Sequence, residues 1–389
     1  MPQSGGFWTA MSIFALVLSA SLLSAQAELP GDTPDFTFPE ELQLIPLDVQ
    51  EAASETDDAA VAEVPDGLSP AEVALYRAQL AWVNEDWVLA RRYAETAASG
   101  GDTMAAIMAG LIARDGRDGE GIDLERAITW FRRAADAENT TAMFELGKIA
   151  RDSRWTSQIG SPRRWFEQAA RAGHRGAMLS LGLELRASGI PQEQVDARAW
   201  FERAARAGLA EGMYQYAQML DQGEGGHRDQ VLARQWFEMA AEDRHAEAAL
   251  QAAIMYAEGD GGMQDDDRAR ELMRISAESG YPPAQGQYGL MMYQGRGGEP
   301  DATMAGYWFE QGARGGDAES QFLLAYVLAQ GDGRRQDFDR AYYWTLLAEH
   351  DAEGAWVDNP ARDQLRTALE RVLSPADATR IRAEVATQP

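Results

Sequence analysis

The chain has 389 residues, of which 62 are acidic and 35 basic, and its formal net charge is −27. A surface of this sign repels phosphate backbones and anionic lipids, which argues against nucleic-acid binding and electrostatic membrane docking. The absence of cysteine excludes disulfides, thiolate catalysis, cysteine-ligated zinc and acylation at a lipoprotein cysteine.

Residues 1–27 have the features of an export signal. An uncharged apolar run at 11–23 is followed by small residues at Ala25 and Ala27, spaced as in an A-x-A cleavage site. No Lys or Arg precedes the run, so an uncleaved inner-membrane anchor is the alternative. We expect cleavage before Glu28, no membrane insertion afterwards, and a periplasmic or secreted protein.

Residues 28–68 contain twelve Asp or Glu residues and no Lys or Arg. Their prolines interrupt any helix or inner strand, and their like charges repel one another. This composition predicts an acidic, disordered linker. Within it, Phe36–Val49 is more apolar than a linker needs. This stretch is either an imperfect linker or a docking segment, for a partner or for the protein's own groove.

Folded structure is expected to begin at residue 69. Ser69 suits an N-cap, Pro70 suits the first helical position, and Glu72 completes a capping box. From there the chain alternates helix and turn, with no strand-like alternation of useful length.

The helical part repeats itself every 35–37 residues. The repeats align on the first residue of a mostly aromatic pair, the anchor position: Tyr93, Trp130, Trp165, Trp200, Trp236, Leu272, Trp308 and Trp344. In most repeats a small residue stands three positions before the anchor and another four positions after it, as Ala197 and Ala204 do around Trp200. These positions share one helix face. We therefore expect Trp200 to be a wedge between helices, whose replacement by alanine would cost ~3–5 kcal/mol.

Glycine columns mark the helix ends. Eight residues after most anchors stands a glycine suited to a left-handed turn, namely Gly101, Gly173, Gly208, Gly280 and Gly316, whereas Glu138 and Arg244 replace it in two repeats. The second helix has its own column of small residues: Gly110, Gly147, Gly182, Ala217, Ala253, Gly289 and Ala325. Glycine within a helix costs about 1 kcal/mol relative to alanine, so its recurrence indicates close helix crossing. Because one helix pair cannot bury its own apolar face, the pairs must stack into an all-α solenoid.

The columns resemble the Sel-one-like repeat (SLR), a relative of the tetratricopeptide repeat. The resemblance is carried by AMFELGKIA (142–150), AMLSLGLEL (177–185), AQGQYGLMM (284–292) and ARAWFERAARAG (197–208). It implies a right-handed superhelical solenoid of about seven helix-turn-helix repeats, at residues 69–350, and a C-terminal capping region at 351–389, where 373–386 is similar to the closing helix of such arrays. It also implies a protein-interaction scaffold, since exported bacterial members are similar to regulators or assembly factors of the cell envelope.

The chemistry-bearing residues match no catalytic pattern. His174 and His245 share a repeat position but lie two repeats apart, too far to share a metal, so we expect surface histidines. No carboxylate pair is singled out as in a glycosidase, and phosphate-loop and serine-nucleophile motifs are absent. We therefore expect no enzymatic activity, no cofactor, and no catalytic or metal-binding residues.

Two acidic, glycine-rich turns, 115–123 and 259–267, faintly resemble calcium loops. Neither has the alternating oxygen ligands with a terminal glutamate that such loops require. Weak calcium binding at these turns is the alternative to plain solvated turns.

The strongest functional candidate is a surface. If the units pack as tetratricopeptide units do, the second helix of each repeat lines the concave side. We then expect a partner-binding groove that includes Phe144, Lys148, Leu179, Tyr214, Gln218, Leu250, Phe322 and Tyr326. A mostly apolar stripe with a few polar points suits a bound helix or extended peptide. The alternative is that these columns pack between adjacent helices.

The sequence thus favours a non-enzymatic scaffold or adaptor of the bacterial envelope that binds a protein or peptide partner. The second hypothesis is a structural or carbohydrate-associated factor that supports exopolysaccharide or peptidoglycan machinery, with aromatic rings stacking on sugars.

Overall fold

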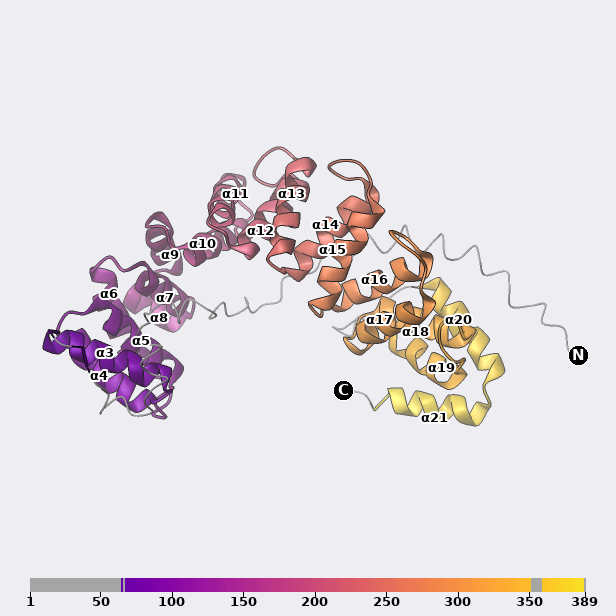
Figure 1. The fold of residues 1–389 in the computed structure, drawn as a ribbon, viewed down its shortest axis with the longest axis horizontal. Coiled ribbons are helices and arrows are strands. Elements are labelled where there is room, and N and C mark those ends of the chain that lie inside the picture. The colour runs from indigo at the N-terminus through magenta and orange to yellow at the C-terminus, as the bar shows by residue number, and fades with distance from the viewer. Residues whose placement is uncertain (1–63, 66, 351–358, 388–389) are drawn as a thin grey trace, which may run out of the picture. The chain divides into compact units, whose positions relative to one another are not determined.

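The computed structural model describes residues 64–65, 67–350 and 359–387 (Figure 1). The predicted signal at 1–27, nearly all of the linker at 28–68 and the segment Phe36–Val49 lie outside the described residues. Every regular element in the described part of the chain is a helix, as predicted. The helices divide into two compact units, one ending at Gln264 and one beginning at Asp265.

Within each unit, most successive helices pack against one another in chain order, but 162–171 packs on 140–150 and 375–385 packs on 338–347. The described helices of the first unit are α3 (Pro70–Val83), α4 (Trp87–Ser99), α5 (Thr103–Asp115), α6 (Leu124–Asp136), α7 (Thr140–Ala150), α8 (Ser153–Ile159), α9 (Pro162–Arg171), α10 (Arg175–Ala187), α11 (Pro191–Arg206), α12 (Ala210–Gln222), α13 (Gln230–Glu242) and α14 (Ala246–Glu258). Those of the second unit are α15 (Asp266–Glu278), α16 (Pro282–Gln294), α17 (Ala302–Arg314), α18 (Ala318–Gln330), α19 (Phe338–Leu347), α20 (Pro360–Val372) and α21 (Pro375–Val385).

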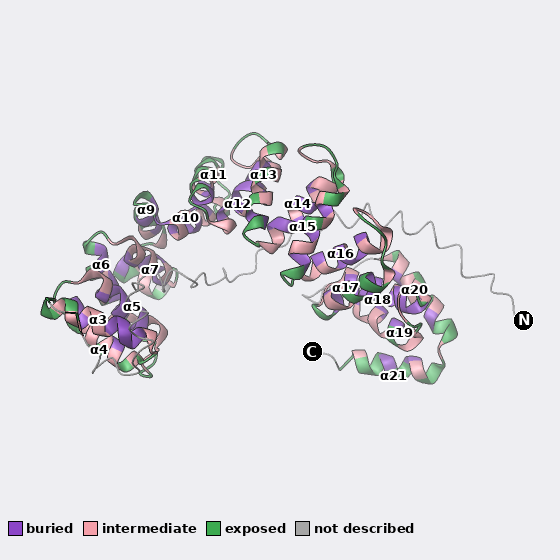
Figure 2. Ribbon diagram, viewed as in Figure 1, coloured by how far each residue is buried: buried purple, intermediate pink, exposed green. Residues whose placement is uncertain are grey.

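Two helices alternate in each repeat. We call the helices that carry the anchor position the anchor helices: α4, α6, α9, α11, α13, α15, α17 and α19. We call those that carry the small-residue column the small-column helices: α5, α7, α10, α12, α14, α16 and α18. Buried residues line the sides where these helices face one another (Figure 2). The array is a helical solenoid, which confirms the predicted fold class.

The core of each repeat is built by the residue after the anchor. Phe201 is fully buried, whereas its neighbour Trp200 is only partly buried, and Arg203 lies over the Trp200 ring at 4.5 Å. The Phe201 ring lies directly on Gly182 of α10, where a Cβ atom would come within 2.6 Å of it. The expectation that Trp200 is the wedge was therefore wrong. The wedge is Phe201, because Phe201, one residue after Trp200, lies on the side of α11 that faces α10.

The same arrangement recurs in other repeats. A ring covers a small-column glycine at three further places: Phe131 on Gly110, Phe166 on Gly147 and Phe309 on Gly289. In each, a Cβ atom on the glycine would lie 2.5–2.8 Å from the ring, closer than real Cβ contacts. The predicted close helix crossing is thus confirmed, and its cause is a phenylalanine ring seated where a side chain would otherwise stand.

The predicted helix ends are also confirmed. The glycines eight residues after the anchors have positive φ, and so do the residues that replace them in two repeats, Glu138 and Arg244, both at φ 61°. A left-handed conformation costs a non-glycine residue roughly 1–2 kcal/mol. The turn geometry therefore belongs to the repeat and is kept even where the sequence opposes it.

Both ends of the helical region are capped as expected. Ser69 and Glu72 form the capping box at the start of α3, with the Ser69 amide donating to the Glu72 carboxylate over 2.7 Å. Ser374 caps α21, the closing helix predicted at 373–386. One element was not anticipated: a short helix, α8, lies between α7 and α9, after which Ser161 caps α9.

Candidate interaction surface

The position nine residues after each anchor is the N-cap of the following small-column helix. Its occupants are Asp102, Asn139, His174, Leu209, His245, Tyr281 and Asp317. His174 accepts a hydrogen bond at Nδ1 from the Ala177 amide over 3.1 Å, and His245 accepts one from the Ala248 amide over 3.3 Å. The imidazole nitrogen takes the place of the Asp or Asn oxygen found in other repeats.

These two histidines also join neighbouring small-column helices. The His174 ring stacks on Phe144 of α7, with ring centroids 4.5 Å apart, and the His245 ring stacks on Tyr214 of α12 at 4.8 Å. The prediction of exposed surface histidines was therefore wrong for both, because each ring is held between a helix terminus and an aromatic ring. The result is two equivalent junctions, two repeats apart.

Charged side chains surround the first junction, and together they form what we call the Phe144 cluster: Arg114, Phe144, Glu145, Lys148 and His174. Glu145 lies 2.6 Å from Arg114 of α5 and 3.5 Å from Lys148. The Lys148 ammonium lies 5.7 Å above the Phe144 ring. Burial acts to lower the pKa of Arg114, but its ion pairs with Glu145 and Asp115 outweigh burial and raise that pKa. The cluster thus holds α5, α7 and α10 together with fixed charges.

A hydrogen-bonded network surrounds the second junction and forms the Tyr214 cluster: Arg186, Glu211, Tyr214, Gln215, Gln218 and His245. Arg186 of α10 donates to Gln215 over 2.9 Å and to Gln218 over 3.1 Å. Gln215 in turn donates to Glu211 over 2.7 Å, and Gln218 donates to the Tyr214 hydroxyl over 2.7 Å. The network therefore spans α10, α12 and α14.

The histidine at this junction has a defined tautomer. Because His245 Nδ1 accepts the Ala248 amide, its proton lies on Nε2, which donates to Glu211 over 2.8 Å. Burial acts to raise the pKa of Glu211, yet the hydrogen bonds from His245 and Gln215 hold it below its ordinary value. The cluster is a hydrogen-bonded patch in which each polar group is committed to another.

The eight predicted groove residues divide by burial. Leu179, Leu250 and Phe322 are 4–6% exposed and lie within the packing of the helices. The other five are partly exposed: Phe144, Lys148, Tyr214, Gln218 and Tyr326. The structure brings Phe144 and Lys148 together in one cluster and Tyr214 and Gln218 together in the other. The predicted apolar stripe is thus interrupted.

Sequence reasoning did not identify Arg114, Arg186, Glu211 or either histidine as members of these clusters. The histidines carried a usable signal, since the same repeat position holds Asp102, Asn139 and Asp317, typical N-cap residues. The arginines carried none, because no sequence spacing shows which neighbouring helix a long side chain reaches.

The acidic turns hold their carboxylates in other contacts. In 115–123, Asp118 lies 2.8 Å from Arg91, and Glu120 pairs with Arg91 and Arg126, which lower the pKa of Glu120. In 259–267, Asp265 caps α15 and Asp266 lies 2.7 Å from Arg296. Within the described ranges, no group of three or more His, Asp or Glu side chains is arranged to hold a metal.

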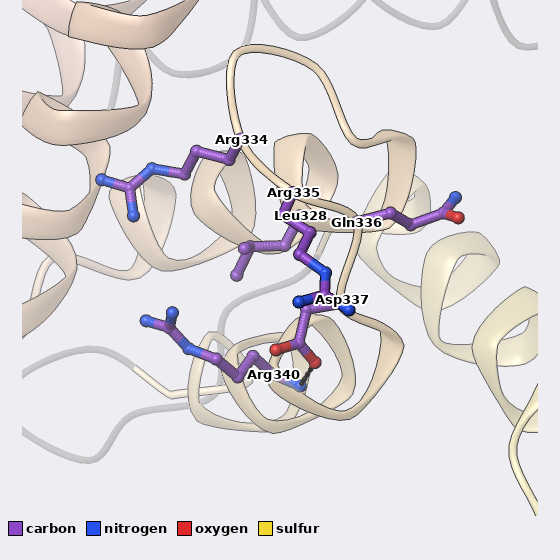
Figure 3. Close-up of a pocket in the computed structure, with 6 residues that line it drawn as sticks. All are labelled: Leu328, Arg334, Arg335, Gln336, Asp337 and Arg340. Carbon is purple, nitrogen blue, oxygen red and sulfur yellow. Dashed lines mark hydrogen bonds between the residues drawn. The ribbon is translucent and has the colours of Figure 1, made fainter.

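A basic hollow lies beside the turn between α18 and α19 (Figure 3). Its lining residues are Leu328, Arg334, Arg335, Gln336, Asp337 and Arg340. Arg334 and Arg340 extend to the same side in Figure 3, and both contact Glu310 of α17, at 2.6 and 3.2 Å. Burial acts to raise the pKa of Glu310, but these arginines and Arg314 lower it. The hollow is therefore a point where the turn is fastened to α17.

Among the helices that the structure describes, none has both the length and the apolar character needed to cross a membrane.

Comparison with known proteins agrees with this architecture. The Sel1 repeat family model matches residues 103–139, 163–174, 176–209, 210–245, 246–281, 282–317 and 318–349. A similar solved structure is c5321, a protective antigen present in uropathogenic Escherichia coli strains that displays an SLR fold. It has 21% identity and a TM-score of 0.63, over 88% of this chain and 76% of that one. Another is a Sel1 repeat protein from Oxalobacter formigenes, with 22% identity and a TM-score of 0.57, over 88% of this chain and 98% of that one. A search of curated proteins gave no match.

The family model covers more than half of the chain, and the matched segments include the helices from α5 to α19 except α7 and α8. Sel1 repeats generally serve as scaffolds for protein–protein interaction. The chain is a member of the Sel1 repeat family.

Proposed function

We propose that this protein is a non-enzymatic scaffold of the bacterial cell envelope that binds a partner protein or peptide through the face bearing the Phe144 and Tyr214 clusters. Within the helical array, that face is the predicted concave side. The predicted export signal at 1–27 supports the envelope assignment. The acidic linker at 28–68 then serves as a tether that gives the helical region at 69–350 its reach.

The observation that carries the proposal is the equivalence of the two clusters. Each presents a partly exposed aromatic ring and fixed polar groups on neighbouring small-column helices, and each is braced by a histidine that caps the next helix. Side chains already held in place lose little conformational entropy on binding. Because the polar groups are committed to one another, the clusters suit recognition better than proton transfer.

Photo-cross-linking in the native bacterium tests this proposal. A photoreactive amino acid at position 148 or 218 should give cross-links to one common partner. The matched control is position 231, since Val231 is 56% exposed but lies on anchor helix α13. Cross-links of equal yield from position 231, or none from 148 and 218, would contradict the proposed face.

A second measurement separates binding from folding. Tyr214→Ala should weaken binding of the cross-linked partner while lowering the melting temperature only modestly, because Tyr214 is partly exposed. Tyr216→Ala is the matched control, since Tyr216 is buried against Trp236. Tyr216→Ala should therefore lower the melting temperature more than Tyr214→Ala does. A large melting loss for Tyr214→Ala with unchanged binding would refute the recognition role.

The alternative, a carbohydrate-associated envelope factor, depends on aromatic rings that stack on sugars. Phe322 is buried and the Tyr214 ring is stacked on His245, so neither offers a fully open ring. Glycan-array binding by the full chain that is lost in Tyr214→Ala would favour this alternative.

A further inference from the structure

Glu319, the second residue of α18, has an unusual environment in the second unit. Its Oε2 atom accepts a hydrogen bond from Gln287 of α16 over 3.0 Å. Its Oε1 atom is shielded from solvent and has no hydrogen-bond partner among the residues that the structure describes. A buried carboxylate oxygen without a partner is costly, so its retention indicates a group that is paired under other conditions.

The charges near Glu319 have its own sign. Asp317, the N-cap of α18, is committed to the Ser320 amide over 2.7 Å, and burial raises the Asp317 pKa. Burial and the Asp317 charge together raise the pKa of Glu319 to about 7. Residues 351–358, outside the described residues, contain no Lys, Arg or His, so they have no cationic side chain to supply.

An equivalent carboxylate in the first unit shows what is missing. Glu211 is also the second residue of a small-column helix, and its Oε2 atom lies 2.8 Å from His245, the N-cap of the next small-column helix. At the same spacing after Glu319 as His245 has after Glu211, the sequence has Glu353, which lies outside the described residues. The sequence therefore has no histidine at this spacing from Glu319, and no described residue donates to its Oε1 atom.

Aromatic residues accompany Glu319 on the same helix face. Phe322 and Tyr326 follow it by three and seven residues, and Tyr326 is partly exposed. On α16, Tyr293 donates to Asp332 over 2.6 Å, at the opposite end of α18 from Glu319. Carboxylates next to tyrosine rings attract guanidinium and ammonium groups, through charge and cation–π contacts.

We propose that Glu319 and Gln287 form a recognition site for a cationic side chain, arginine or lysine, presented by a partner protein. The cation pairs with the unpartnered Oε1 atom when the partly exposed Glu319 side chain turns toward solvent, as His245 supplies the donor for Glu211. This inference deepens the proposed scaffold function, since it states the chemistry of a bound segment, but it concerns the second unit and a different set of residues.

Peptide titration of the purified full chain tests the site. The probe is a fluorescein-labelled peptide of four Ala-Arg repeats, with an Ala-Gln peptide as the neutral control. At pH 8, Glu319→Gln should weaken binding of the arginine peptide at least tenfold. Glu299→Gln, which removes the same charge from an exposed turn of the same unit, should change binding less than twofold.

The unmodified protein supplies an independent readout. Because a bound cation favours the ionised carboxylate, binding at pH 7 should release about half a proton per site, seen by calorimetry in buffers of different ionisation enthalpy. Equal affinity of Glu319→Gln and the unmodified chain, or binding without proton release, would overturn the assignment. These results do not depend on the cross-links from positions 148 and 218, so either proposal can fail alone.

Discussion

The substitution Gly182→Ala has two opposing effects on stability, and the size of each is known. Helix propensity alone would stabilise α10 by about 1 kcal/mol. The new Cβ atom, however, would stand 2.6 Å from the Phe201 ring, where ordinary contact begins at 3.4 Å. The fully buried ring would have to retreat by about 0.8 Å into a packed core. Overpacking of this kind costs roughly 1–3 kcal/mol, so after the gain in helix propensity we expect a net loss of up to about 2 kcal/mol.

Urea unfolding followed by circular dichroism measures this loss. The loss should shrink when Phe201→Leu is also present, because a smaller, more flexible side chain can yield. Ala217→Gly is the reciprocal control: the same column already holds alanine in α12, so this substitution should also destabilise, by about 1 kcal/mol from helix propensity alone. A Gly182→Ala protein about 1 kcal/mol more stable than the parent, as helix propensity alone predicts, would refute the claim that the ring requires glycine.

Three further predictions concern stability. Phe201→Ala should lower the free energy of unfolding in urea by about 3–5 kcal/mol, and Trp200→Ala should lower it clearly less, because only Phe201 is fully buried. Equal losses would show that Trp200 also fills the space between the helices. Arg244→Gly should raise stability by about 1 kcal/mol in the same assay, since φ is 61° there; a lower melting temperature would show that the arginine side chain matters more than the backbone. The Glu319 pKa of about 7 lies above its ordinary value of 4.5, so the folded state holds this proton more tightly. Its contribution to the free energy of unfolding, up to ~3 kcal/mol, should be complete below pH 4.5 and should disappear as pH rises through 7. The Glu319→Gln variant should lack this decline in stability. If stability changes with pH in the same way in the variant and the unmodified protein, the burial of this carboxyl is contradicted.

The repeat period made most of the fold predictable. Glycine and small-residue columns recur in phase, so turn positions, helix order and the closing helix at 373–386 could be predicted from the sequence. The error at Trp200 has a physical reason. Both residues of an aromatic pair fit an apolar helix face, and their positions differ by only 100° around the helix. Which one meets the neighbouring glycine depends on how two helices cross.

The candidate site was predictable only in part. The partly exposed members, such as Tyr214 and Lys148, lie in columns that periodicity could identify. Leu179 and Phe322 lie in the same columns but are buried, because burial depends on what the adjacent repeat places against each position. No property of the residue itself distinguishes these outcomes.

The sequence by itself determined the all-helical repeat, its period, its turn positions and its membership of the Sel1 repeat family, since all of these follow from local chemistry repeated in phase. Only the tertiary structure decided which ring covers Gly182, that the rings of His174 and His245 stack on neighbouring helices, and that among the described residues only Gln287 donates to the Glu319 carboxylate. Those facts arise between residues about 20–35 positions apart, where packing brings helices together. Contacts of that range depend on side-chain direction and helix crossing, which a sequence pattern does not contain.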